Sequence, residues 1–338
     1  MNYGTILKQA WKTLWKHKII IWVGLTIILP GLITGLAYGI FLAFFSDGFF
    51  EKLDAFFYSP TPPTPNYLYI FLGILGYLSF FVLGLLLRTF SQTTVTVGTL
   101  LAKDRTEKIS FRELWEKSKP YFGRVLALLL LIGLAMFIAI LVPYFITMIA
   151  AILTMGIGLL CMIPLFFLII PLGMVGYIFI SLSTPVVVVE DLSISETITR
   201  IWALLKEKFW SLILFELILY GILVGVSVIF IIPGQAVQYF YTPQMMNPSV
   251  NYYADMTEMM RTMGLVTIFV LPFSLVTQGF TLTYSDSAWL FALLDITAPE
   301  ETSEEAEIQS PEKNLPEPSN DTDKEEETTE FLSPSEES

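Results

Sequence analysis

The longest stretch without charge in this chain identifies its solvent. From Val125 to Val189, 65 consecutive residues include no Asp, Glu, Lys or Arg. A hydrocarbon core about 30 Å thick is crossed by roughly 20 helical residues, so the stretch is too long for one span and long enough for two. We therefore expect a helical hairpin inside a lipid bilayer, and a chain of the polytopic membrane class.

Charge is divided between a nearly neutral body and an acidic tail. Only 15% of the 338 residues are charged, compared with about 25% in soluble domains. The formal charge is −12, but residues 299–338 contain 15 acidic residues against Lys313 and Lys324. We expect this tail to be disordered, because it is too polar to form a core, and to offer an acidic surface to protein partners. Residues 1–298 are the expected membrane domain, and no basic surface for nucleic acid is indicated.

Hydropathy predicts an all-α fold with six transmembrane helices, since backbone groups in lipid must bond within a helix. Basic residues in the connections are strongly asymmetric: thirteen lie in the N-terminal segment and in the second and fourth connections, whereas only Lys52 and Arg261 lie on the other side. Both termini are therefore expected in the cytoplasm of a prokaryotic cell, with a tight turn near residue 150 outside. The expected spans are 19–45, 67–88, 124–147, 154–183, 209–232 and 264–286.

Three short amphipathic segments precede spans on the basic side and predict interfacial helices. In the first, Leu7, Trp11 and Leu14 share one helical face. The other two begin with Ser110-x-x-Glu113 and Ser193-x-x-Glu196, the spacing of a capping box. The segments indicate either an internal repeat of helix plus hairpin or a common requirement of topology. On the other side, residues 47–57 and the proline-rich 59–65 are expected along the outer leaflet.

The scarcity of reactive side chains argues against most enzyme chemistry. The chain has one cysteine, Cys161, and one histidine, His17. Metal sites built from these residues and catalytic Ser/His or Cys/His arrangements are therefore not expected, and no cofactor is expected. A methionine-rich face offers soft ligands for copper(I) but equally suits packing against lipid or a helix. It comprises Met245, Met246, Met256, Met259, Met260 and Met263.

The candidate functional site is an intramembrane polar group centred on Glu216. Charges within spans are costly and need partners. Arg88 is the basic candidate nearest in depth, and Gln92 and Gln278 are candidates for hydrogen bonds. The group is interpreted either as a structural contact between spans or as a site that relays protons or coordinates a cation. Asp286, near the end of the last span, is expected in a capping or interfacial role.

Two segments resemble a known family. One reads STPVVVVEDLSISETITRIWALLKEKFW from Ser183, and the other reads EKISFRELWEKSKPYFGRV from Glu107. They are similar to the glycerophosphoryl diester phosphodiesterase membrane-domain family and its prokaryotic relatives. The resemblance implies six spans over residues 1–290 and no diesterase activity, because the paired histidines of the catalytic domain are absent. The chain also departs from the family where Tyr284-Ser285-Asp286 is not followed by basic residues.

Two functional classes follow from these observations. The first is a non-enzymatic structural or accessory membrane component that binds other membrane or cytoplasmic proteins. The second is a small-molecule or ion transporter or channel that uses the polar groups within the spans. A cavity beside Glu216 favours the second class and a dry interior favours the first. An enzyme acting on lipid is disfavoured because no acid, base and nucleophile converge.

Overall fold

The computed structural model describes residues 1–45, 67–105, 107–154, 162–245 and 252–298. All regular elements in these residues are helices. Six of the helical segments are long and apolar enough to cross a membrane, and they begin at Lys18, Ile74, Phe111, Ile169, Ile194 and Thr257. The all-α polytopic fold is confirmed, and the chain is a multi-pass membrane protein.

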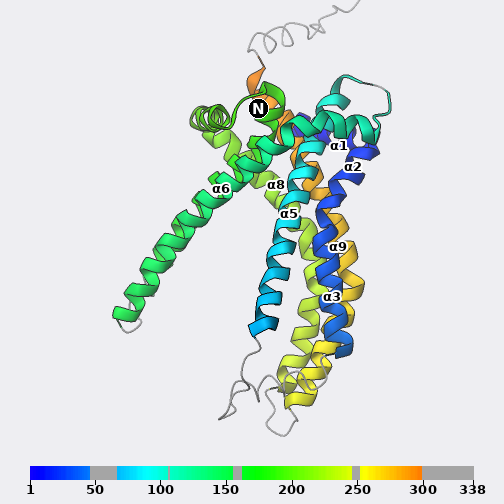
Figure 1. Ribbon diagram of the computed structural model, residues 1–338, viewed down its shortest axis with the longest axis vertical. Helices are drawn as coiled ribbons and strands as arrows, with labels where there is room; N and C mark the ends of the chain where they lie inside the picture. Colours follow the sequence, from blue (N-terminus) through cyan, green and yellow to red (C-terminus); the bar gives the residue numbers. More distant parts are fainter. Residues whose placement is uncertain (46–66, 106, 155–161, 246–251, 299–338) are drawn as a thin grey trace, which may run out of the picture. The chain divides into compact units, whose positions relative to one another are not determined.

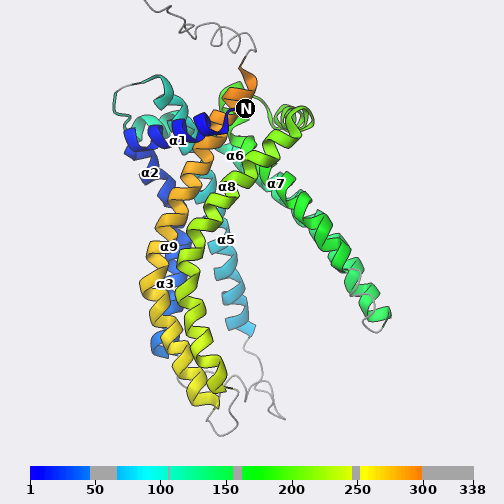
Figure 2. The same ribbon diagram turned by 180° about the vertical axis from the view of Figure 1, so that it is seen from behind.

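The helices lie largely side by side (Figures 1 and 2). Neighbouring helices in the sequence pack together along α5–α6, α6–α7, α7–α8 and α8–α9, and α9 returns to pack along α3. The elements are α1 (Tyr3–Lys16), α2 (Lys18–Gly24), the 3₁₀ turn η1 (Leu25–Ile28), α3 (Leu29–Phe45), α5 (Tyr67–Asp104), α6 (Phe111–Leu153), α7 (Met162–Glu190), α8 (Ile194–Met245) and α9 (Tyr252–Thr297).

The uncharged run forms the α6–α7 hairpin, as expected. Helix α6 continues to Leu153, past residue 150, where the turn was expected. Arg124, which precedes the run, reaches the segment just beyond its other end, where it donates to the Asp191 carboxylate at 2.7 Å and to the Leu192 carbonyl at 3.1 Å. Asp191 adopts φ = 51°, a left-handed conformation that Asp tolerates better than most residues and that turns the chain from α7 into α8.

Helix α1 lies across the same end of the spans as this turn. Its buried residues are Ile6, Ala10 and Leu14, whereas Trp11 is 48% exposed. Helix α1 packs on α9 and α5, and Trp11, although half-exposed, contacts the rings of Phe280 and Tyr284 on α9. We call this end the basic end: it comprises α1 and the connections at residues 105–110 and 191–193.

The three amphipathic segments join their spans in three different ways. α1 stops at His17, a non-helical residue with φ −117° and ψ 70°, before α2 starts. The second segment runs into α6 without interruption, with Pro120 inside the helix. The third continues into α8 across a kink at Lys208. Each expected capping box forms only in part: Ser110 accepts from the Glu113 amide, and Glu196 accepts from Ser193.

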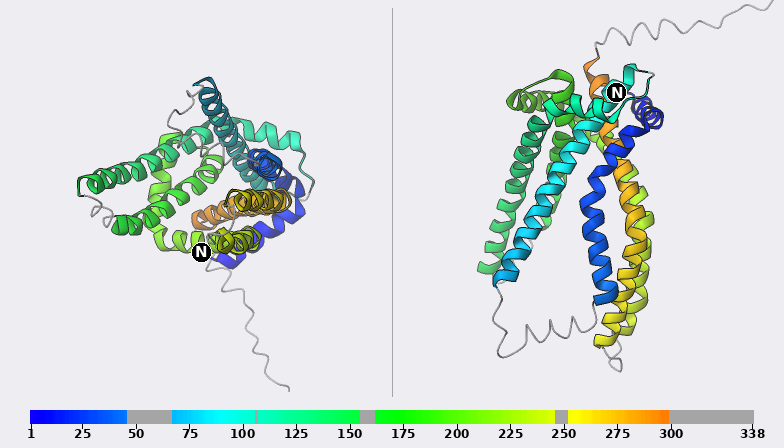
Figure 3. Two further views of the ribbon diagram at one scale, coloured as in Figure 1. Left: turned by 90° about the horizontal axis from the view of Figure 1, so that it is seen from below. Right: turned by 45° about the vertical axis from the view of Figure 1, so that its right-hand side comes forward.

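Helices α3 and α9 approach most closely where glycines face each other. A methyl group added at Gly264 would overlap the backbone of Ala43 and Gly39, and one added at Gly35 would overlap Leu271. Small residues let the helix backbones come together, which is how helices gain packing energy in lipid. The right-hand view of Figure 3 shows α3 and α9 side by side, with α5 separated from them away from the basic end.

Several predictions fall on residues outside those described. The acidic tail at 299–338, the outer segments 47–57 and 59–65, and Met246 lie there. Met259, Met260 and Met263 are half-buried on α9. The copper hypothesis therefore stays a prediction.

Candidate functional site

Glu216 lies inside the helical bundle, in the middle of α8. The side chain is 6% exposed, and its Oε2 atom has no hydrogen-bond partner among the described residues. It follows Lys208, the kink residue, by eight positions, which is about 12 Å along a helix axis. An ionised carboxylate at such a depth is unfavourable unless a cation or several donors compensate for the lost hydration. Glu216 therefore needs either a proton or a partner that the described residues do not supply.

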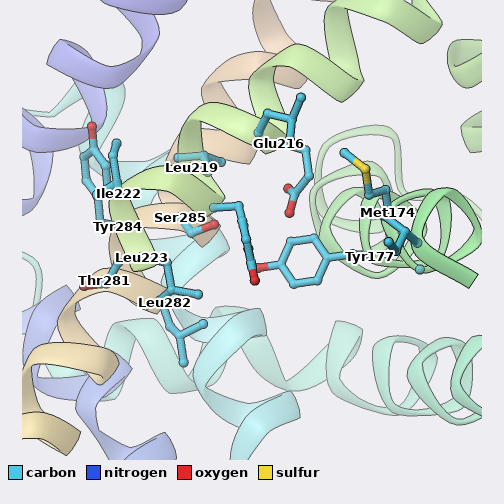
Figure 4. Close-up of a pocket in the computed structure, with 14 residues that line it drawn as sticks. Met174, Tyr177, Glu216, Leu219, Ile222, Leu223, Thr281, Leu282, Tyr284 and Ser285 are labelled. Atoms are coloured by element: carbon cyan, nitrogen blue, oxygen red, sulfur yellow. The ribbon is translucent and has the colours of Figure 1, made fainter. Parts of the chain in front are cut away.

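Glu216 faces a cavity of about 540 Å³ between α7, α8 and α9. Figure 4 shows its carboxyl group and the Tyr177 side chain entering the same space from different helices. A cavity of this size is in the range that holds one drug-sized molecule. The lining residues are Ile170, Gly173, Met174 and Tyr177 from α7, Glu216, Leu217, Leu219, Tyr220, Ile222 and Leu223 from α8, and Thr281, Leu282, Tyr284 and Ser285 from α9.

The polar groups of the cavity gather where α7 and α9 face Glu216. Tyr177 from α7 and Ser285 from α9 line the cavity together with Glu216 (Figure 4). The Thr281 hydroxyl donates to the Thr277 carbonyl of its own helix, so it retains acceptor capacity. The cavity thus combines one carboxyl group, several hydroxyl groups and otherwise apolar walls.

Three residues were predicted as partners for Glu216, namely Arg88, Gln92 and Gln278, and the structure gives Arg88 and Gln92 other partners. Arg88 pairs with Asp286, with its Nη2 atom 3.6 Å from Oδ1. Asp286 is 6% exposed, so it is a buried ion-pair partner and not the interfacial or capping residue expected from the sequence. Gln278 is exposed on α9. Gln278 shares roughly one helical face with Thr281 and Ser285, which line the cavity, but it precedes Ser285 by seven positions, which is about 10 Å along the helix axis.

Gln92 belongs to a buried polar segment on α5 that the sequence analysis did not single out. Its Nε2 atom donates to the Ile180 carbonyl on α7 at 3.3 Å, and its Oε1 atom has no partner among the described residues. The Thr99 and Ser287 hydroxyls are 3.0 Å apart, joining α5 to α9. The available signal was the run SQTTVTVGT from Ser91 in an otherwise apolar helix, because polar residues in spans turn inward.

The next feature of the site is its set of possible metal ligands. Among the described residues, no group of three or more His, Cys, Asp or Glu side chains is arranged to hold a metal ion. Glu216 and Asp286 are the buried carboxyl groups of the described bundle, and Asp286 already has Arg88 as its partner. Glu216 is therefore the buried carboxyl group of the described bundle that has no ion-pair partner.

Comparisons of this chain with protein-family models, with curated proteins and with solved structures found no match. The resemblance to the glycerophosphoryl diester phosphodiesterase membrane-domain family stays a prediction.

Proposed function

We propose that this chain is a non-enzymatic small-molecule transporter, with a binding site in the cavity around Glu216. The observation that carries the proposal is the buried Oε2 atom of Glu216, which has no partner among the described residues and belongs to a residue that lines a cavity of about 540 Å³. A purely structural glutamate would be satisfied by a neighbouring helix, as Asp286 is by Arg88. A structural or accessory role, the first class considered from the sequence, requires no such cavity.

In this proposal the chain resides in a prokaryotic cell membrane with both termini in the cytoplasm. The asymmetry of basic residues supports this orientation, because Lys8, Lys12, Lys16 and Lys18 all lie at the basic end. Glu216 then lies below the cytoplasmic boundary. The binding site is closer to the cytoplasmic leaflet than to the outer one.

Prolines and a kink in the helices that form the cavity support a mobile binding site. Helix α7 carries Pro171 and Pro185, and α8 is kinked at Lys208. Prolines and kinks weaken the continuous hydrogen bonding of a helix, so small changes in angle between α7 and α8 cost little there. Such changes would open and close the cavity that these two helices form with α9.

Filling the cavity tests the proposal without altering Glu216. A side chain added at Gly173 enters open space, because a Cβ atom there meets nothing within 4 Å, and Gly173 lines the cavity. Gly133 on α6 has equally open surroundings but does not line the cavity, so Gly133→Leu is the matched control for Gly173→Leu.

The measurement is efflux from proteoliposomes loaded with an isotopically labelled extract of prokaryotic metabolites, followed by mass spectrometry. We expect at least one compound to leave faster with the wild-type chain and with Gly133→Leu than with Gly173→Leu. If no compound shows efflux that depends on the wild-type chain, or if Gly173→Leu transports as well as Gly133→Leu, the proposed function is wrong.

A further inference from the structure

The composition of the cavity restricts what it can bind. Glu216 is the one charged side chain among the residues that line it. Arg88 pairs with Asp286, and it does not line the cavity. An anionic ligand would bring a second negative charge next to a buried carboxylate with no compensating cation, which is strongly unfavourable. A cationic ligand would instead supply the partner that Glu216 lacks.

Aromatic rings add to the preference for a cation. Tyr177 and Tyr220 line the cavity from α7 and α8, whereas the Tyr284 hydroxyl on α9 donates to the Leu7 carbonyl. The face of a tyrosine ring attracts an ammonium group within about 6 Å, and the attraction increases when water is excluded. Hydroxyls at Thr281 and Ser285 provide oxygen atoms that accept hydrogen bonds from an N–H donor. A protonated amine uses all three kinds of group.

The remaining wall is hydrocarbon and reaches the lipid-facing surface. Ile170, Leu217 and Tyr220 line the cavity, yet they are 62%, 48% and 57% exposed. They lie on helices that cross the bilayer, so the surface that they share with the cavity contacts acyl chains. The cavity is therefore open sideways between α7 and α8, toward lipid. A ligand entering by this route must be soluble in hydrocarbon over most of its length.

From these three observations we propose that the cavity binds amphipathic amines, with a cationic head against Glu216 and a single apolar chain extending between α7 and α8 into the bilayer. The inference rests on the proposed function, and it names the substrate class and its route of entry. The ammonium group replaces part of its hydration with the Glu216 carboxylate and the hydroxyls of α9. The apolar chain gains contacts with the leucines and isoleucines of the wall.

Binding of radiolabelled octylamine to the full-length chain in nanodiscs tests the inference, with empty nanodiscs to subtract partitioning into lipid. We expect saturable binding that excess unlabelled octylamine displaces and that octanol, octanoate and ethylamine at equal concentration do not. Octanol lacks the charge, octanoate reverses it, and ethylamine lacks the chain. This set of competitors separates the contribution of the head from that of the tail.

Two substitutions on α8 test which carboxylate binds the ammonium group. Glu216→Gln is expected to weaken octylamine binding about 10- to 100-fold, the range for losing one charge-assisted hydrogen bond. Glu207→Gln, a change of the same kind at a mainly exposed position of α8, is expected to leave binding unchanged. Gly173→Leu should abolish binding by occupying the space, which shows that the signal arises in the cavity even if Glu216→Gln folds poorly.

The outcomes separate this inference from the proposed function. Displacement by octanol or octanoate as effective as by octylamine would overturn the amine assignment, while loss of binding in Gly173→Leu would still support a ligand cavity. Saturable binding that survives both Glu216→Gln and Gly173→Leu would place the amine elsewhere and overturn the inference. No saturable binding of octylamine, together with cavity-dependent efflux of another compound, would overturn the inference alone.

Discussion

Helix α5 combines two kinds of surface along one axis. Its described side chains from Phe71 to Val82 are exposed and almost entirely apolar, whereas those from Thr89 to Thr99 are buried and mostly polar. The half near the basic end packs against α2, α6, α7 and α9, and the far half faces lipid. In water the distribution would be reversed. Along α5, burial therefore follows the need of hydroxyl and amide groups for partners, and the exposed apolar side chains are left to the bilayer.

The far half of the fold is not uniformly open, and α3 with α9 shows how packing is achieved there. These helices use glycine in place of hydrogen-bonding side chains, with Gly39 and Gly264 in close contact. The basic half is thus held by a hydrophobic core together with polar contacts and ion pairs, and the far half by close approach of backbones. The predictions below test this division, from the largest expected effect to the smallest.

Breaking the Arg88–Asp286 pair should be the most damaging change. Asp286→Asn leaves Arg88 without its partner, and we expect a loss of about 3 kcal/mol in the free energy of unfolding, the lower end of the range for buried pairs. The lower end applies because Arg88 is 23% exposed. Unfolding in mixed micelles measures the loss.

The matched control is Glu116→Gln, which breaks the exposed pair with Arg112 and should cost about 0.3 to 0.5 kcal/mol. A double variant, Arg88→Met with Asp286→Leu, removes both charges and should recover most of the stability. If Asp286→Asn costs no more than Glu116→Gln, polar contacts do not hold the basic half.

Adding one methyl group to the far half should also destabilise the fold. Gly264→Ala places a Cβ atom against the backbone of Ala43 and Gly39, which cannot rotate away. We expect a loss of about 1 to 3 kcal/mol, as for other overpacked sites. Gly225→Ala on α8 meets nothing within 4 Å and should be neutral or stabilising, because alanine is the better helix former. Equal effects at the two glycines would contradict the packing described for α3 and α9.

Removing or adding one hydroxyl group shows how the two halves of α5 differ in their effect on stability. Thr99→Val removes a buried hydrogen bond to Ser287 and should cost roughly 0.5 to 1.5 kcal/mol. The reverse change, Val82→Thr, lies on the lipid-facing half, where the new hydroxyl can donate to its own helix as Ser79 does to the Leu75 carbonyl. We expect Val82→Thr to change stability by less than about 0.5 kcal/mol. A larger cost at Val82 than at Thr99 would reverse the comparison.

The smallest effect should be a dependence on pH at the basic end. His17 is 4% exposed, and burial, with Lys16 nearby, lowers its pKa below the usual 6.5. The unfolded chain therefore takes up the proton first as the pH falls. The histidine contribution to stability is complete above pH 6.5 and declines below it. The difference in unfolding free energy between the wild-type chain and His17→Gln isolates this contribution, because the chain has one histidine. A difference that is constant from pH 8 to pH 5 would contradict the lowered pKa.

The sequence predicted the membrane spans of this chain well, but it did not predict the contacts of the candidate site. Hydropathy sufficed for the six spans, because a hydrocarbon core requires about 20 apolar residues whatever the fold. Glu216 was identified for a similar reason, since a charge within a span is costly in any arrangement. Its predicted partners were wrong because depth along the membrane normal fixes only one coordinate. Which groups lie beside one another at a given depth, such as Arg88 and Asp286, is set by helix rotation and packing.

The amino-acid sequence by itself determined that this protein crosses a bilayer several times, where its charges concentrate, and that Glu216 requires an explanation. These properties depend on the free energy of transferring each side chain from water to lipid, which is nearly local. Only the tertiary structure decided that Asp286 pairs with Arg88 and that the hydroxyl groups of α5 near the basic end are buried. It also decided that Glu216 faces a cavity between α7, α8 and α9. These properties depend on helix rotation and tilt, which many weak contacts between distant residues determine together.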